Sequence, residues 1–318
     1  MKKLFWLLLI PTWAFAQAYP TKPVKMIIPF APGGASDFVG RIMQPKMNEL
    51  LGQPIVVENR PGAAGNIGAE AAAKSAPDGY TIFLGNVGSV AINPGVYPKL
   101  SITPTRDLVA VTQVVDVPSA LIVHPSLPVG SIRELVAHAK ANPGKLNYAS
   151  PGSGSLDRLE MEVLRKLEGL DMVHVPYKGG AGPATAGLMG GETNVMFATA
   201  ASAMPGIKSG RLKPIAVTGG KRLEALPNVP TVQEEGYPDL AASSWQGIFV
   251  PAGTPREVVE RLFSVTQQVM KDPDVIARLK NGGAEAVTSA SSAAFAQYVV
   301  AETERWARIA KESNATPD

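Results

Sequence analysis

The sequence contains no cysteine among its 318 residues and only three histidines. Without cysteine the chain has no disulfide bonds, no thiolate metal sites and no N-terminal cysteine to carry a lipid. After the first sixteen residues, no stretch approaches the roughly 18 apolar residues that a membrane-spanning helix needs. Basic runs and basic patches interleaved with aromatic residues are also missing, so the sequence gives little support to nucleic-acid binding.

The motifs of common enzyme classes are missing as well. There is no G-x-S-x-G elbow of serine hydrolases, and no H-E-x-x-H or other His/Asp cluster with metal-ligand spacing. His138 falls in the middle of a predicted helix, while His124 and His174 end predicted strands, so we interpret all three as structural or surface residues. We predict that the protein is not an enzyme and that it uses neither a metal nor a cofactor.

The first residues are typical of a secretory signal peptide. Lys2 and Lys3 precede the apolar run 4–10, and residues 14–16 form an A-x-A cleavage signal. Cleavage after Ala16 would start the mature chain at Gln17 and remove two of the 30 basic residues, which leaves 28 against 27 acidic ones, a net charge of +1. We therefore predict a periplasmic protein without ATP-driven chemistry.

The rest of the chain alternates predicted strands and helices, the pattern of an α/β fold with a mostly parallel sheet. Strand patterns occur at 24–30, 54–59, 80–86, 120–124, 145–150, 171–177, 193–199 and 212–219. Helix patterns occur at 37–51, 65–80, 133–144, 156–169 and 183–191. Further helices are predicted from capping signals at 254–257 and 272–273, and a last helix carries Tyr298, Trp306 and Ile309.

Two α/β units without a flexible tether indicate two lobes joined by crossing strands, with a ligand cleft between them. The predicted division is a signal peptide at 1–16, a first lobe at 17–122, a second lobe at 123–225, and a return to the first lobe with C-terminal helices at 226–318.

Two glycine-rich junctions between a strand and a helix are the main site candidates. They are "IIPFAPGGASDFVGRI" (27–42) and "NYASPGSGSLDRLEMEVL" (147–164). Such a junction directs backbone N–H groups of a helix N-terminus at whatever lies above the strand end, and so favours an anion. Neither carries a nucleotide-binding fingerprint. One such loop in each lobe predicts a site for a metabolite-sized anion; two tight turns without a ligand are the alternative.

Two further stretches have open interpretations. Asp37 either supports the start of its helix or accepts a hydrogen bond from a ligand hydroxyl, an ammonium group or an ordered water. Tyr177 and Lys178, in "HVPYKGG", either reach the cleft or belong to a strand-to-loop junction with a solvated lysine.

Over nearly the whole mature chain, the sequence resembles the tripartite tricarboxylate transporter substrate-binding family, also called Bug-type periplasmic receptors. The stretches that carry the resemblance are "YPTKPVKMIIPFAPGGASD", "LGQPIVVENRPGAAGNIGAE", "PDGYTIFLGN", "AINP", "YASPGSGS", "HVPYKGG", "LPNVPTVQEEGYP" and "PAGTP".

The resemblance implies a two-lobed type II periplasmic-binding-protein fold, in which each lobe is a mixed sheet flanked by helices. It implies that the lobes close on a small organic acid whose carboxylate lies between loops 30–37 and 150–155, partly through ordered waters. Asn86 is expected to contact the distal end of the ligand. The predicted ligand-binding residues are Phe30, Gly33, Gly34, Ala35, Ser36, Asp37, Asn86, Ser150, Gly152, Ser153, Gly154, Ser155, Tyr177 and Thr199.

The chain departs from the family pattern at two places. After the second loop the family usually has a histidine followed by a leucine, whereas this chain has Asp157, Arg158 and Leu159. In the helix at 183–190 the family frequently has an aspartate before the leucine, whereas this chain has Gly187. These changes bear on the identity of the ligand more than on the fold, and Arg158 alters either ligand preference or only the surface.

The predicted function is capture of a small carboxylate by a monomeric receptor. The acid is a di- or tricarboxylate, an aromatic acid or an amino-acid-like compound, and the partner is an inner-membrane transporter of the tripartite tricarboxylate type. A sensor receptor of the same fold and an exported enzyme that uses the cleft are the alternatives.

Overall fold

The computed structural model describes residues 19–312; the predicted signal peptide lies outside this range. In chain order the strands are β1 (Val24–Ile28), β2 (Ile55–Asn59), β3 (Thr81–Asn86), β4 (Leu108–Val123), β5 (Asn147–Ser150), β6 (Val173–Pro176), β7 (Val195–Thr199), β8 (Lys213–Val217), β9 (Ser243–Pro251) and β10 (Glu285–Ala286).

The α-helices are α1 (Ala35–Leu51), α2 (Asn66–Ala73), α3 (Asn93–Val96), α4 (Pro104–Asp107), α5 (Ile132–Ala141), α6 (Leu156–Glu168), α7 (Ala181–Met189), α8 (Ala200–Lys208), α9 (Arg256–Val269), α10 (Pro273–Asn281) and α11 (Ser292–Glu312). Shorter helical segments are the 3₁₀ turns η1 (Ala63–Gly65) and η3 (Pro238–Leu240) and the π-helical segment η2 (Gly88–Ile92). No helix between residues 19 and 312 is long and apolar enough to cross a membrane.

Strand β4 joins two groups of strands. Residues 108–118 of β4 pair antiparallel with β9, and residues 119–123 pair antiparallel with β7 and β8. On one side β1 pairs parallel with β2 and β3, and on the other β5 pairs parallel with β6 and β7. The sheet is therefore mixed, because the parallel βαβ units are linked through antiparallel crossing strands.

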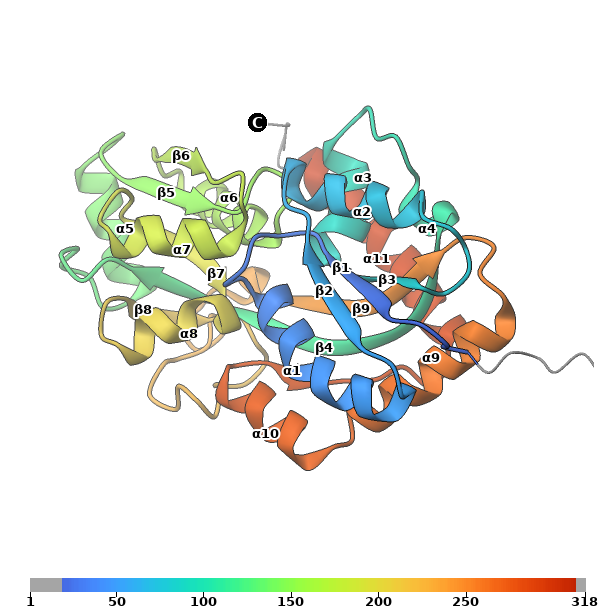
Figure 1. Cartoon of the computed structure of the whole chain (residues 1–318). Helices are drawn as coiled ribbons and strands as arrows, with labels where there is room; N and C mark the ends of the chain where they lie inside the picture. Colours follow the sequence, from blue (N-terminus) through green and yellow to red (C-terminus); the bar gives the residue numbers. More distant parts are fainter. Residues whose placement is uncertain (1–18, 313–318) are drawn as a thin grey trace, which may run out of the picture.

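Two lobes lie side by side (Figure 1). We call the first lobe the part built on β1, β2, β3, β9, β10 and the beginning of β4, and the second lobe the part built on β5 to β8 and the end of β4. Helices cover both faces of the sheet in each lobe. The sequence predicted this α/β, two-lobed fold class correctly.

The lobe boundaries deduced from the sequence differ from the packing. Residues 119–123 pair with second-lobe strands, and Val232 and Leu240 pack in the core formed by Leu135 and Phe197 of the second lobe. We therefore propose boundaries near residues 118 and 242 in place of 122 and 225.

Local capping signals account for several helix ends. Ser131 accepts a hydrogen bond from the backbone N–H of Glu134, and Asp272 caps α10. Helix α1 ends at Gly52, whose φ of 69° is left-handed. The capping box expected at 254–257 is wrong: the Thr254 hydroxyl donates to the Pro251 carbonyl and leaves α9 without a side-chain cap.

Candidate functional site

A small cavity lies between the two lobes. Its volume is about 40 Å³. The first lobe lines it with Phe30, Gly34, Ala35, Ser36, Asn86, Val87, Gly88 and Ser244, and the second lobe lines it with Pro151, Ser155, Leu156, Asp157, Ala181 and Thr199.

Four helices begin at this cavity. Ala35 and Ser36 open α1, Leu156 and Asp157 open α6, Ala181 opens α7, and Thr199 is the N-cap of α8. The first N–H groups of a helix have no acceptor within it, and the helix N-terminus carries a partial positive charge. Within residues 19–312, no lysine or arginine lines the cavity, so its positive potential comes from the backbone.

Half of the sequence-predicted site residues line the cavity. These are Phe30, Gly34, Ala35, Ser36, Asn86, Ser155 and Thr199. The other predicted residues do not line it; they are Gly33, Asp37, Ser150, Gly152, Ser153, Gly154 and Tyr177. Sequence reasoning did not select Val87, Gly88, Pro151, Leu156, Asp157, Ala181 or Ser244 as site residues.

The second loop is held in place by its own side chains. The Ser150 hydroxyl lies 2.6 Å from His174 Nε2 and accepts from the backbone N–H of Gly152. The Ser155 hydroxyl donates to the Gly152 carbonyl and accepts from the backbone N–H of Arg158. Gly152 has a φ of 118°, which requires glycine. Ser150 and Gly152 therefore shape the loop that presents Ser155 to the cavity.

Gly154 contacts the opposite lobe. A Cβ atom there would lie 1.7 Å from Asn93 Oδ1 and 3.0 Å from the ring of Tyr97, both in the first lobe. The glycine is thus required by the approach of the two lobes.

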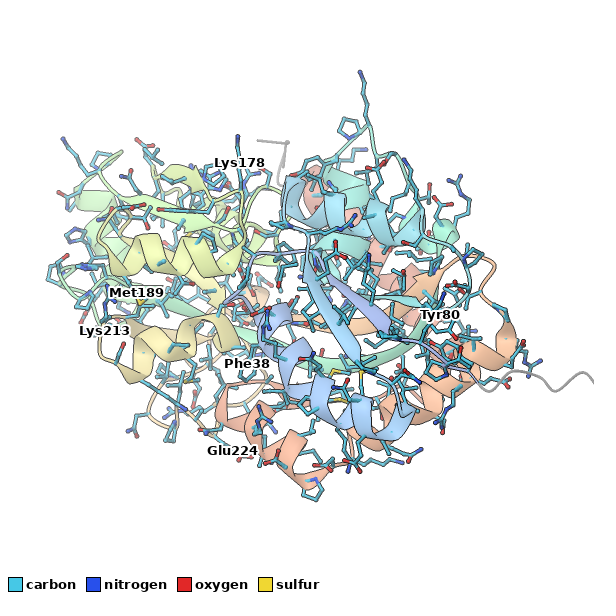
Figure 2. All side chains as sticks on the ribbon, in the orientation of Figure 1. Phe38, Tyr80, Lys178, Met189, Lys213 and Glu224 are labelled. Atoms are coloured by element: carbon cyan, nitrogen blue, oxygen red, sulfur yellow. The ribbon has the colours of Figure 1, made fainter. Side chains whose placement is uncertain are left out.

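Tyr177 and Lys178 lie away from the cavity. The Tyr177 hydroxyl donates to Glu192 Oε2 at 2.7 Å, and a Cβ at Gly187 would lie 2.1 Å from that hydroxyl. Gly187 therefore makes room for the tyrosine ring. Lys178 is exposed and extends from the surface of the molecule (Figure 2).

A second interlobe contact lies next to residues that line the cavity. The Ala31 N–H donates to the Gly179 carbonyl at 3.0 Å. A Cβ at Gly182, in the first turn of α7, would lie 2.7 Å from the Pro32 carbonyl oxygen and 3.3 Å from the Gly34 nitrogen. Backbone thus packs on backbone where the lobes meet, and the structure represents a closed arrangement.

Asp37 lies outside the cavity, in a separate groove of about 550 Å³ beside α1, α8 and α10. Its Oδ1 accepts from Arg41 Nε at 2.9 Å and Asn59 Nδ2 at 3.1 Å, and its Oδ2 accepts from the Gly33 N–H at 3.2 Å. Burial alone would raise the pKa of Asp37, but these three hydrogen bonds outweigh burial and lower it. The contacts favour helix and loop support over ligand contact.

We expect Asp37→Ala to lose about 1–3 kcal/mol of stability at pH 7, because three hydrogen bonds to a buried carboxylate are lost, and to bind ligand normally once folded. Since the folded pKa is lowered, the stabilisation is present above the unfolded pKa of about 3.9 and is lost as the pH falls through the folded value. Urea unfolding at pH 7 and pH 3, with calorimetric titration, measures both effects.

Asp274→Ala is the matched control, because Asp274 also lies in a first helical turn and pairs with an arginine four residues later, but is exposed. It should lose far less stability. Weakened binding by folded Asp37→Ala would instead assign Asp37 to the ligand site.

Asp157 and Glu160 form a buried acidic pair in the first turns of α6. Both are 3% exposed. Asp157 Oδ1 accepts one long hydrogen bond, 3.4 Å, from the Ser119 hydroxyl, and neither carboxylate oxygen of Glu160 has a hydrogen-bond partner of ordinary geometry. Burial raises the pKa of Asp157, and burial together with the charge of Asp157 raises the pKa of Glu160. No metal site explains the pair, because residues 19–312 contain no suitable group of three ligands.

Comparison with known proteins identifies several relatives. A model of the tripartite tricarboxylate transporter family receptor matches residues 39–315. Protein BugT of Bordetella pertussis is 34% identical over 301 residues, which cover 94% of this chain and 92% of BugT.

Two solved structures are also similar. R. palustris Rpa4515 with adipate is 33% identical with a TM-score of 0.90, and the match covers 94% of this chain and 99% of that one. MatC from Rhodopseudomonas palustris with bound malate is 31% identical with a TM-score of 0.86, covering 92% and 99% of the two chains.

Proposed function

The chain belongs to the tripartite tricarboxylate transporter receptor family, and we propose that it captures a small organic carboxylate between its lobes and delivers it to a membrane transporter of that type. The proposal includes export by the N-terminal signal, action as a periplasmic monomer and no turnover of the bound acid. The relatives crystallised with adipate and malate support the carboxylate class.

The observation that carries the proposal is the meeting of four helix N-termini at one cavity without a basic side chain. Backbone N–H groups and oriented dipoles stabilise an anion without holding a cation in the empty site. Hydrogen bonds to an ionised group contribute about 1.5–3 kcal/mol each. Three or four of them are sufficient for micromolar affinity, which corresponds to about −8 kcal/mol.

The position of the cavity implies movement of the lobes. Both lobes line it, and their backbones meet beside it. The ligand therefore enters when the lobes separate, and the lobes close on it. Contacts between Ala31 and Gly179 and between Gly34 and Gly182 are the ones that form on closure.

Thermal unfolding of the protein with mono-, di- and tricarboxylates, aromatic acids and amino acids tests the function. A ligand at about a hundred times its dissociation constant adds roughly 2.7 kcal/mol of stability, so a true ligand gives a clear rise in Tm. Recovery of the acid unchanged after incubation supports binding without catalysis. If no carboxylate raises Tm, or if the acid is converted, the proposed function is wrong.

A further inference from the structure

Among residues 19–312, Asp157 is the one side chain of an acidic or basic residue that lines the cavity. It is almost fully buried, and so is Glu160, which lies one turn further along α6. Among residues 19–312, the groups next to the two carboxylates are the Ser119 and Thr218 hydroxyls and the backbone N–H of Thr199, and none of them is a cation. The described part of the chain therefore supplies no positive side chain to this pair.

A buried carboxylate without a cation is costly, and its cost falls when a partner of opposite charge enters. A plain dicarboxylate would bring further negative charge against Asp157. A ligand with a protonated amine would bring the missing counter-charge, while its carboxylate occupies the helix N-termini on the same cavity wall.

We propose that the ligand is an amino acid whose carboxylate binds at the helix N-termini and whose protonated amine pairs with Asp157. This inference rests on the proposed function and narrows it to one class of carboxylate. Asp157 is then the residue that sets specificity.

The test uses acids of two to six carbons in matched forms: the plain acid, the 2-hydroxy acid, the 2-amino acid, the terminal amino acid and the dicarboxylate. Calorimetric titration at pH 7 gives a dissociation constant for each. We expect the tightest binder to carry an amine, with at least tenfold higher affinity than its plain, hydroxy and dicarboxylate counterparts.

The variant Asp157→Asn should weaken binding of that amino acid on the order of a hundredfold, as loss of one partner of a buried charge pair does, and should leave the plain acid nearly unaffected. Glu168→Gln is the matched control: it removes a carboxylate from the far end of the same helix, where Glu168 pairs with Lys140 and Tyr237, and should bind as the wild type does.

The wild-type series decides the question even if Asp157→Asn does not fold. Preference for a dicarboxylate or a hydroxy acid, or failure of every amino acid to bind, overturns the inference and leaves the proposed function intact. If folded Asp157→Asn loses affinity equally for the amino acid and for the plain acid, the inference is also overturned. Failure of all carboxylates to bind contradicts the proposed function itself.

Discussion

A Gly182→Val variant is expected to fold and to lose most of its affinity for ligand. Gly182 lies in the first turn of α7, where its backbone angles are open to any residue because its φ is not left-handed. The atoms nearest to an added Cβ are the Pro32 carbonyl oxygen at 2.7 Å, the Gly33 carbonyl carbon at 3.2 Å and the Gly34 nitrogen at 3.3 Å. All three belong to the opposite lobe, so the clash arises only when the lobes meet.

Overpacking of this kind costs about 1–3 kcal/mol, and here the cost falls on the closed state alone. Since apparent affinity falls in proportion to the population of the competent state, we expect a roughly 5- to 150-fold weaker dissociation constant by calorimetry. Without ligand, Tm should stay close to that of the wild type.

Gly220→Val is the matched control, since a Cβ at Gly220 meets nothing within 4 Å and its φ is not left-handed. It should bind normally. Gly182→Ala gives a smaller side chain at the same contact and should have an intermediate effect. Wild-type affinity in Gly182→Val, with folding confirmed, would show that this contact between the lobes is not needed for binding.

The second large effect is a gain of stability in Glu160→Gln. Burial, then the charge of Asp157, raises the pKa of Glu160 in the folded protein. A raised carboxyl pKa means that the folded protein keeps a proton that the unfolded chain releases above about pH 4.3. Stability therefore falls as the pH rises from that value through the folded pKa.

Glutamine has nearly the same shape and no charge, so Glu160→Gln removes this loss. At pH 7 we therefore expect Glu160→Gln to be more stable than the wild type. Urea unfolding between pH 4 and pH 8 should show the difference shrinking toward zero at pH 4.

The Glu168→Gln variant should change the stability in the opposite direction. Hydrogen bonds from Lys140 and Tyr237 lower the pKa of Glu168, so its removal should slightly reduce stability above pH 4.3 and have no effect well below that value. If Glu160→Gln is no more stable than the wild type at pH 8, burial of this pair carries no cost, and Asp157 does not lack a counter-charge.

The sequence by itself determined what depends on neighbours in the chain. The glycine-rich junctions before α1 and α6, the Ser131 cap and the Gly52 helix end all follow from backbone geometry over a few residues. Alternation of strands and helices then predicted the α/β class, and the two loops led to Gly34, Ser36 and Ser155, which do line the cavity.

Tertiary structure decided what depends on distant contacts. Strand β9 and helix α8 had no local pattern that the sequence reading detected, and Ser244 lies at the cavity only because β9 crosses between the lobes. Gly154 and Asp37 have the same local sequence signals as residues that line the cavity. In the structure, however, Gly154 packs against Asn93 of the opposite lobe. Asp37 accepts hydrogen bonds from Arg41 and Asn59.

Helix α6 shows the physical reason most clearly. The apolar residues of this helix recur on one face, at Leu156, Leu159, Val163, Leu164 and Leu167. Leu167 is nevertheless 51% exposed, while Asp157 and Glu160 are buried. Periodicity reports where apolar side chains recur along a helix, but burial at the N-terminal end of α6 is set by two lobes that meet there. The free-energy cost of a buried charge depends on every group around it, so it is set by the tertiary contacts between the lobes.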